Sequence, residues 1–115
     1  MWGEPHMLYI RAEDFYEEAR SCSAMSRQEE LQCARQMRAG DALARERLIR
    51  SYLPMTAAYI SRMPAHRQSL RLILDCRQAL EKAVDSFDFL QDSEPFSHRL
   101  NWHLRSAVTR YIADR

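Results

Sequence analysis

Apolar residues along the chain recur with the spacing of α-helices, and no stretch alternates with the period of two that is typical of strands. Near the start, this spacing predicts a helix over residues 8–21. Ser26 and Glu29 have the spacing of a capping box, which predicts that a second helix begins there and ends at Gly40. Asp41 then caps a third helix, with Ala44, Leu48, Ile49 and Tyr52 on its apolar face.

Prolines divide the remainder of the chain. Pro54 lacks the N–H that a helix interior needs, so the third helix kinks or restarts there, and the pattern ends before Pro64. A loop over 64–68 and a helix over 69–86 follow. After a second loop, Ser93 is expected to cap a last helix whose apolar stripe is Phe96, Leu100, Leu104, Ala107, Val108 and Tyr111. The sequence therefore predicts an all-α fold, a compact bundle of about five to six helices.

The composition fits a folded domain. It is 46% hydrophobic and 29% charged, with two Gly and four Pro, which argues against disorder and against a turn-rich β fold. No apolar run approaches the roughly 18 residues of a membrane span, and no signal peptide is visible, so a cytoplasmic protein is expected. Cys22, Cys33 and Cys76 lack CxxC spacing, which favours reduced thiols over a zinc site or disulfides.

Charge divides the chain into two parts. Residues 1–32 carry seven acidic residues against three arginines, a net charge of −4, whereas residues 33–115 carry a net +5. All of the basic residues except Lys82 are arginine, which binds phosphates and stacks on bases. We therefore expect an acidic helical extension over residues 1–25 and a domain over residues 26–115 that suits a polyanion. A genome rich in arginine codons accounts equally well for the arginine bias.

Catalytic patterns are weak. The histidines His6, His66, His98 and His103 lack metal-ligand spacing, and two glycines cannot build a phosphate-binding loop. No nucleophile elbow or pair of carboxylates is apparent. The expectation is a protein that is not an enzyme and that has neither a cofactor nor a metal.

The last predicted helix carries the most informative surface. Opposite its apolar stripe it presents Arg99, Trp102, His103, Ser106, Thr109 and Arg110. Cations for phosphates and a large ring for stacking are the two components of a single-strand binding site. The alternative is that Trp102 packs under the loop over 87–94 and that the arginines form a solvated face.

Several segments resemble bacterial RNA polymerase sigma factors. Glu30-Leu31, Arg38-Ala39-Gly40-Asp41, residues 44–49 and Tyr52-Leu53-Pro54 are similar to the first helices of that family. Residues 79–88 resemble the end of its polymerase-binding helix, and residues 95–97 and 104–114 resemble its promoter-melting helix. The resemblance covers residues 28–115 and rests on the order and spacing of these segments.

The resemblance implies a helical domain that grips a coiled coil of the large catalytic polymerase subunit and captures flipped bases of the non-template promoter strand. By position, the implied DNA-binding residues are Phe89, Phe96, Arg99, Trp102, His103, Ser106 and Thr109, with Arg105 and Arg110 as phosphate contacts. The implied polymerase-binding residues are Arg71, Leu74, Asp75 and Arg77.

Some positions depart from the family pattern. Arg99 stands where an aromatic residue is usual, and His103 stands where primary sigma factors carry the second of two tryptophans. On the polymerase side, Leu74 and Cys76 replace a usual Gln and Gly, and Arg71 replaces a usual acid. Reversing a charge at an interface rim weakens or redirects docking.

These departures leave a second hypothesis open. The chain ends at Arg115, where sigma factors continue into a domain that reads the upstream promoter element. The alternative function is a protein-interaction module with a sigma-like fold that has lost promoter recognition. Its partner would be an anti-sigma regulator, a second sigma subunit or another copy of itself. The acidic N-terminal helix either lies across the basic last helix and blocks it or forms a solvated face.

Overall fold

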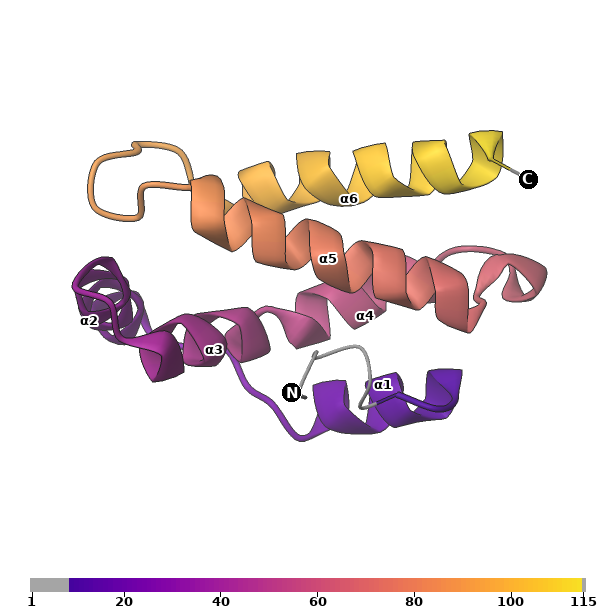
Figure 1. The fold of residues 1–115 in the computed structure, drawn as a ribbon, viewed down its shortest axis with the longest axis horizontal. Coiled ribbons are helices and arrows are strands. Elements are labelled where there is room, and N and C mark those ends of the chain that lie inside the picture. Colours follow the sequence, from indigo (N-terminus) through magenta and orange to yellow (C-terminus); the bar gives the residue numbers. More distant parts are fainter. Residues whose placement is uncertain (1–8, 115) are drawn as a thin grey trace.

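The two longest helices, α5 (Leu70–Ser86) and α6 (Phe96–Ala113), lie antiparallel and side by side (Figure 1). The computed structural model describes residues 9–114, and this part of the chain is all-α, as predicted. Helices α1 (Ala12–Arg20), α3 (Ala42–Ser51) and α4 (Leu53–Ser61) pack below α5, whereas α2 (Arg27–Arg38) packs on α3 at one end.

The predicted helix boundaries in the middle of the chain are confirmed. Ser26 accepts the backbone N–H of Glu29, and the Glu29 carboxylate accepts the N–H of Ser26. Gly40, with a φ of 100°, ends the α2 region in a conformation that side chains disfavour. The Asp41 carboxylate then accepts the N–H groups of Leu43 and Ala44 and so caps α3. These caps hold α2 and α3 as a tight hairpin.

The first helix is shorter than predicted. It begins at Ala12 because the Asp14 carboxylate accepts the backbone N–H groups of Ile10 and Arg11, each at 2.9 Å, and thereby caps the helix there. These bonds also lower the pKa of Asp14. Leu8, at which the predicted helix begins, lies outside the described residues. Tyr9 is buried although it precedes the helix.

Two loops differ in detail from the prediction. Pro54 stands in the first turn of α4, so the helix restarts as expected. The loop after Pro64 contains a short 3₁₀ turn, η2 (Ala65–Arg67). Ser93 does not cap α6: Pro95 occupies the N-cap position and no side chain caps the helix. The ring of Pro95 fixes its φ, here −62°, and its extended ψ of 146° places it just outside the helix.

A continuous apolar core lies between α5 and its neighbours. Fully buried aliphatic side chains come from α3, α4, α5 and α6: Leu48, Ile49, Leu53, Ile60, Leu72, Ile73, Leu80, Leu100 and Leu104. Cys33 and Cys76 are buried and Cys22 is half-buried, and all three are free thiols. Burial raises the pKa of the Cys76 thiol to about 12. None of the helices in the described region is long and apolar enough to span a membrane.

Arg77 is the exception within this core, because its side chain is only 2% exposed. Its Nη1 donates to Tyr9 Oη at 2.6 Å and to Glu18 Oε1 at 3.3 Å, and its Nη2 donates to Glu46 Oε2 at 3.4 Å. Glu81 Oε2 lies 3.6 Å from Nε. Glu18 also accepts hydrogen bonds from Tyr9 and from Arg50. One buried cation therefore joins α1, α3 and α5.

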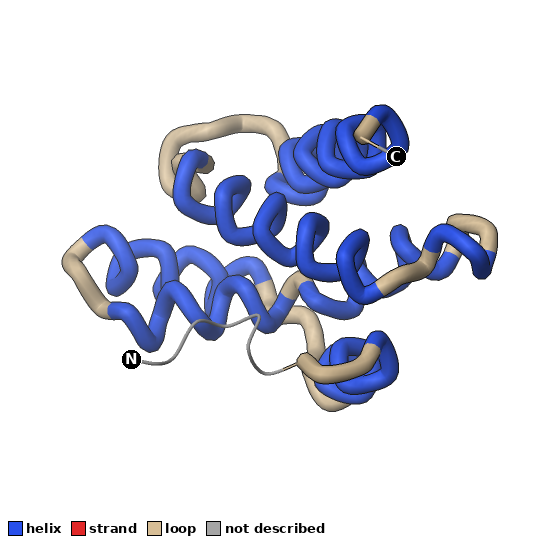
Figure 2. Tube along the Cα trace, turned by 45° about the vertical axis from the view of Figure 1, so that its right-hand side comes forward, coloured by secondary structure: helices blue, strands red, loops and turns tan. Residues whose placement is uncertain are grey.

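Helix α1 lies on the far side of the bundle from α6. It packs against α4 and α5, and the two views in Figures 1 and 2 agree that the core separates α1 from α6. The hypothesis that the acidic N-terminal helix covers the basic last helix is therefore wrong for the part of that helix that the structure describes. Glu18, one of its acidic residues, faces inward to Arg77.

Arg77→Met should lower the free energy of unfolding by about 3 kcal/mol, because it keeps most of the volume but removes the buried cation that Glu18, Glu46 and Glu81 share, leaving Glu18 with Arg50 as its only cation. Urea unfolding followed by circular dichroism measures this loss. The matched control is Arg71→Met, on the same helix, because its ion pair with Asp75 is exposed and stabilises by at most about 1 kcal/mol. Equal losses for the two variants would contradict the role given to Arg77.

Candidate nucleic-acid interface

One side of α6 is buried and the other is open. Leu100, Leu104 and Ala107 face the core, and Val108 is nearly as buried. On the opposite side the Trp102 side chain is 60% exposed, which makes it one of the most exposed large apolar residues of the described chain. Trp102 is therefore not packed under the loop over 87–94, and its ring is available to a partner.

A groove of about 530 Å³ runs between α5 and α6 beside Trp102. Three cations line it: Lys82 from α5, and Arg105 and Arg110 from α6. Its other lining residues are Ala79, Trp102, His103, Ser106 and Thr109. None of these side chains is a carboxylate, and the three cations form no ion pair with a residue of the described chain. The groove therefore combines an aromatic ring with cations that form no ion pair within the described chain, while the carboxylates of Asp75 and Asp114 line only the neighbouring cavity.

His103 lies within this groove. Its ring meets that of Trp102 edge to face, with centroids 5.1 Å apart and an interplanar angle of 82°. Burial, followed by the charges of Arg99 and Lys82, lowers the pKa of His103 below its usual value. The ring is therefore neutral at pH 7 in the free protein, so it adds no charge to the groove.

Two of the residues implied by the family resemblance do not reach the surface. Phe89 and Phe96 are each 2% exposed and pack with Phe87 and Tyr52 in one aromatic cluster. A buried ring has no free face on which a base can stack in this conformation. We therefore correct the expected surface by omitting Phe89 and Phe96, which hold the loop between α5 and α6 against the core.

Arg99 is half-buried and lies outside the lining of the groove. Its guanidinium carbon is 5.8 Å from the centroid of Phe87, which is the geometry of a cation–π contact. Its guanidinium group therefore lies over a ring of the protein's own aromatic cluster. The charge of Arg99 nevertheless helps to lower the pKa of His103, which lines the groove.

Lys82 is the cation of the groove that the sequence analysis did not predict. It belongs to α5, whereas the predicted surface was drawn from α6 and from the loop before it. A usable signal was present, because Ala79 and Lys82 are three residues apart and share a helix face. What the sequence could not show is that this face of α5 lies beside Trp102.

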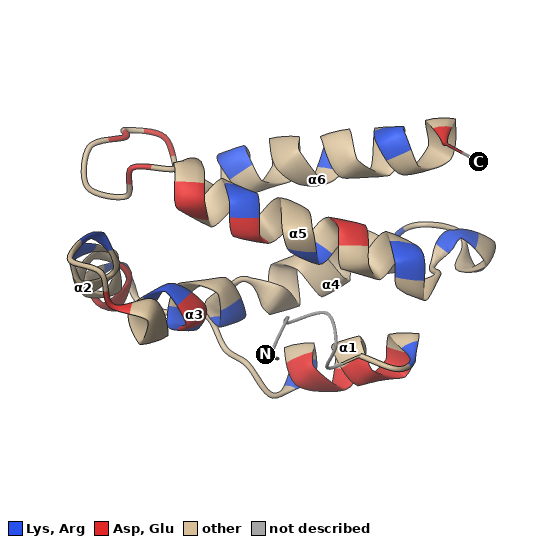
Figure 3. Ribbon diagram, viewed as in Figure 1, with Lys and Arg blue, Asp and Glu red and all other residues tan. Residues whose placement is uncertain are grey.

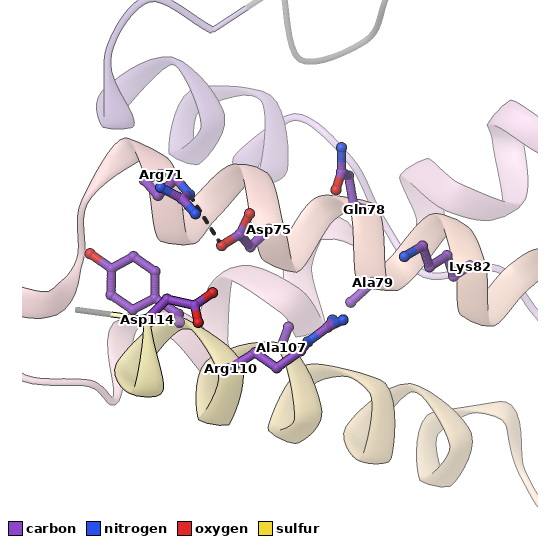
Figure 4. A pocket seen from close by; sticks show the side chains of 9 residues that line it. Arg71, Asp75, Gln78, Ala79, Lys82, Ala107, Arg110 and Asp114 are labelled. Carbon is purple, nitrogen blue, oxygen red and sulfur yellow. Dashed lines mark ion pairs between the residues drawn. The ribbon is translucent and has the colours of Figure 1, made fainter.

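The residues expected to contact polymerase divide between two sides of α5. Arg71 is exposed, Leu74 and Asp75 are half-buried, and Arg71 Nε lies 3.6 Å from Asp75 Oδ2. Arg71 and Asp75 line a second cavity of about 180 Å³, with Gln78, with Arg110 of α6 and with Asp114 directly after that helix (Figure 4). Arg77 points the other way into the core, so it is removed from the expected polymerase surface.

Charge is distributed unevenly over the bundle. Acidic residues concentrate on α1 and in the loop before α6, whereas α6 carries basic residues along most of its length (Figure 3). Asp85 and Asp88, which lie near the start of that loop, pair with Arg45 and Arg38. Acidic side chains at this end of α5 are thus engaged away from the groove.

The chain is similar to two curated sigma factors, although no family model matches it. It is 34% identical to the RNA polymerase sigma factor SigA of Clostridium acetobutylicum over 92 residues, which are 79% of this chain and 24% of that protein. It is 31% identical to SigA of Listeria monocytogenes over 114 residues, which are 98% of this chain and 29% of that protein. The chain thus spans about a quarter of the length of these relatives. The second match also extends N-terminal to the resemblance recognised over residues 28–115.

Fluorescence quenching tests the electrostatics of the groove. In a Trp2→Phe variant, in which Trp102 is the remaining tryptophan, iodide should quench the indole efficiently because the nearby cations attract anions. Adding Lys82→Gln and Arg110→Gln should reduce iodide quenching about twofold at low ionic strength. Quenching by neutral acrylamide should stay unchanged. A loss of quenching by both agents would mean that the substitutions changed the exposure of the ring.

Proposed function

We propose that this chain, a sigma-factor-like domain by its similarity to the SigA proteins, binds single-stranded promoter DNA and core RNA polymerase. The observation that carries the DNA part is the exposed Trp102 beside a groove whose cations have no carboxylate partner. The non-template strand near the transcription start would occupy this groove.

Binding to a single strand has two physical components here. A base stacks on the indole of Trp102, which is worth about 1–3 kcal/mol for an aromatic residue. Lys82, Arg105 and Arg110 attract the phosphates, and this part weakens as salt rises because counterions are released on binding. Ser106 is half-buried and Thr109 is exposed on the same side of α6, where their hydroxyl groups can bond to base edges.

Polymerase binding rests on the family similarity and on the exposed part of α5. Arg71 and Asp75 form a rim pair beside the partly exposed Leu74, which is a small apolar spot within charged surroundings. A coiled coil of the large catalytic subunit is the proposed partner. The Arg71–Asp75 pair makes this surface nearly neutral, so shape and the apolar contact would contribute more than net charge.

Trp102→Ala should weaken binding to a labelled non-template oligonucleotide about 5- to 150-fold, which corresponds to the loss of one stacked base. Lys82→Gln and Arg110→Gln should each reduce the slope of log affinity against log salt by about 0.7. Fluorescence anisotropy over a range of salt concentrations measures both effects.

Arg35→Gln is the control for these charge changes. Arg35 is exposed on α2, away from the groove, and forms no ion pair with a residue of the described chain, so its loss changes net charge equally. Its salt slope should match that of the wild type. Equal effects of Arg35→Gln and Lys82→Gln would mean that binding reflects overall charge, and salt-independent binding would oppose the proposal.

Asp75→Arg should weaken the binding of core RNA polymerase by about tenfold or more, because it replaces the acid of the rim by a second cation beside Arg71. Titration of the labelled domain with purified core enzyme of the host measures this. Glu17→Arg is the matched charge reversal on the exposed face of α1 and should leave the affinity unchanged.

The alternative function predicts a different outcome. If the domain is a protein-interaction module, it should show neither Asp75-dependent binding of core polymerase nor Trp102-dependent binding of the oligonucleotide. Recovery of one small protein partner, or of a stable dimer, together with these negative results would favour that module.

A further inference from the structure

The proposed single-strand site contains one side chain that changes charge near neutral pH. His103 is partly buried in the groove between α5 and α6 and contacts Trp102. It therefore stands where a bound base and its phosphate would lie. The charge state of this ring bears directly on the affinity of the groove for a polyanion.

Cations face His103 from both helices that form the groove. Lys82 projects from α5, Arg99 lies one turn earlier on α6, and Arg105 and Arg110 line the same groove.

Acidic side chains on the nearby part of α5 are directed elsewhere. Glu81 pairs with Arg77 at 3.6 Å, and Asp85 forms two hydrogen bonds with Arg45 at 2.7 and 2.9 Å. The ring is thus surrounded by positive charge without a compensating acid in the groove lining.

We propose that His103 is a proton-linked contact of the single-strand site, neutral in the free protein and protonated when a strand occupies the groove. The inference rests on the proposed function. It assigns a regulation by pH to the same site, in which acidification strengthens the binding of single-stranded DNA.

The direction follows from the charges. In the free protein, burial and the neighbouring cations lower the pKa of His103, which favours the neutral ring. The phosphates of a bound strand offset those cations and raise the pKa of the ring. Because binding then takes up a proton, the affinity rises as the pH falls through the interval between the bound and the free pKa.

The experiment measures binding of labelled oligothymidylate to the full chain between about pH 5.5 and 8, a range in which thymine does not titrate. Wild-type affinity should rise up to about tenfold toward the acidic end. The salt slope should become steeper by about 0.7 over the same range, as one more cation contacts the strand. Calorimetry in buffers of different protonation enthalpy should show proton uptake on binding at neutral pH.

Three variants give this test its controls. His103→Gln should bind with no pH dependence at the weaker level, and His103→Lys should bind with no pH dependence at the tighter level. His98→Gln is the matched control, because His98 is exposed on the same helix but does not line the groove, and it should keep the wild-type pH dependence.

The outcomes separate the inference from the proposed function. If the pH dependence of binding persists in His103→Gln, or disappears in His98→Gln, the inference is overturned while the proposed binding of a single strand still stands. Strand binding by the wild type that does not change with pH also overturns the inference alone. Absence of oligothymidylate binding at every pH overturns both.

Discussion

The guanidinium group of Arg77 lies between α1, α3 and α5, where it meets the carboxylates of Glu18, Glu46 and Glu81. Removing a charge from water is costly, so this arrangement is stable only because several acids and the hydroxyl of Tyr9 surround it. Burial and the hydrogen bond to Glu18 raise the pKa of Tyr9, which keeps that hydroxyl protonated. The contact ties α1 to α3 and α5 at one buried point, beside the apolar packing of Phe15 and Ala19.

This polar contact determines which side of α5 is free. With Arg77 and Glu81 turned toward α1 and α3, Ala79 and Lys82 face α6. The acids near the end of α5 are engaged in the same way, as Asp85 pairs with Arg45. Glu81 and Asp85 are therefore held away from the cations beside Trp102, whereas Asp75 lines only the neighbouring cavity. The rotation of α5 about its own axis therefore places the contacts of Arg77 on one side and the cations of the groove on the other.

Local signals made much of this structure predictable. Ser26, Gly40, Asp41 and Pro54 act on the backbone within a few residues, so the helix boundaries followed from the sequence. The apolar stripe of α6 followed from its spacing, and so did the outward position of Trp102.

Residues whose role depends on contacts distant in sequence escaped prediction. Arg77 lies on the same helix face as the buried Ile73 and Leu80, yet a charged residue is expected at the surface. Its partners from α1 and α3 explain how the charge can be buried there. The resemblance placed Phe89 and Phe96 on the DNA-binding surface because it supplies positions without supplying packing, whereas the helical spacing alone had put Phe96 on the apolar stripe. The structure shows that each ring lies within a cluster that also contains Phe87 and Tyr52, which the chain assembles from three separate segments.

The loop between α5 and α6 is anchored to the rest of the fold at its beginning and is exposed to solvent at its tip. Asp88 accepts the N–H groups of Leu90 and Gln91 and pairs with Arg38, while Phe89 and Phe96 are buried on either side. By contrast, residues 91–94 are exposed. Inserting or deleting residues at that tip costs little loop-closure entropy and leaves the anchors in place. The spacing between the two helices in three dimensions is therefore independent of loop length, and related chains can diverge in length there without moving Trp102.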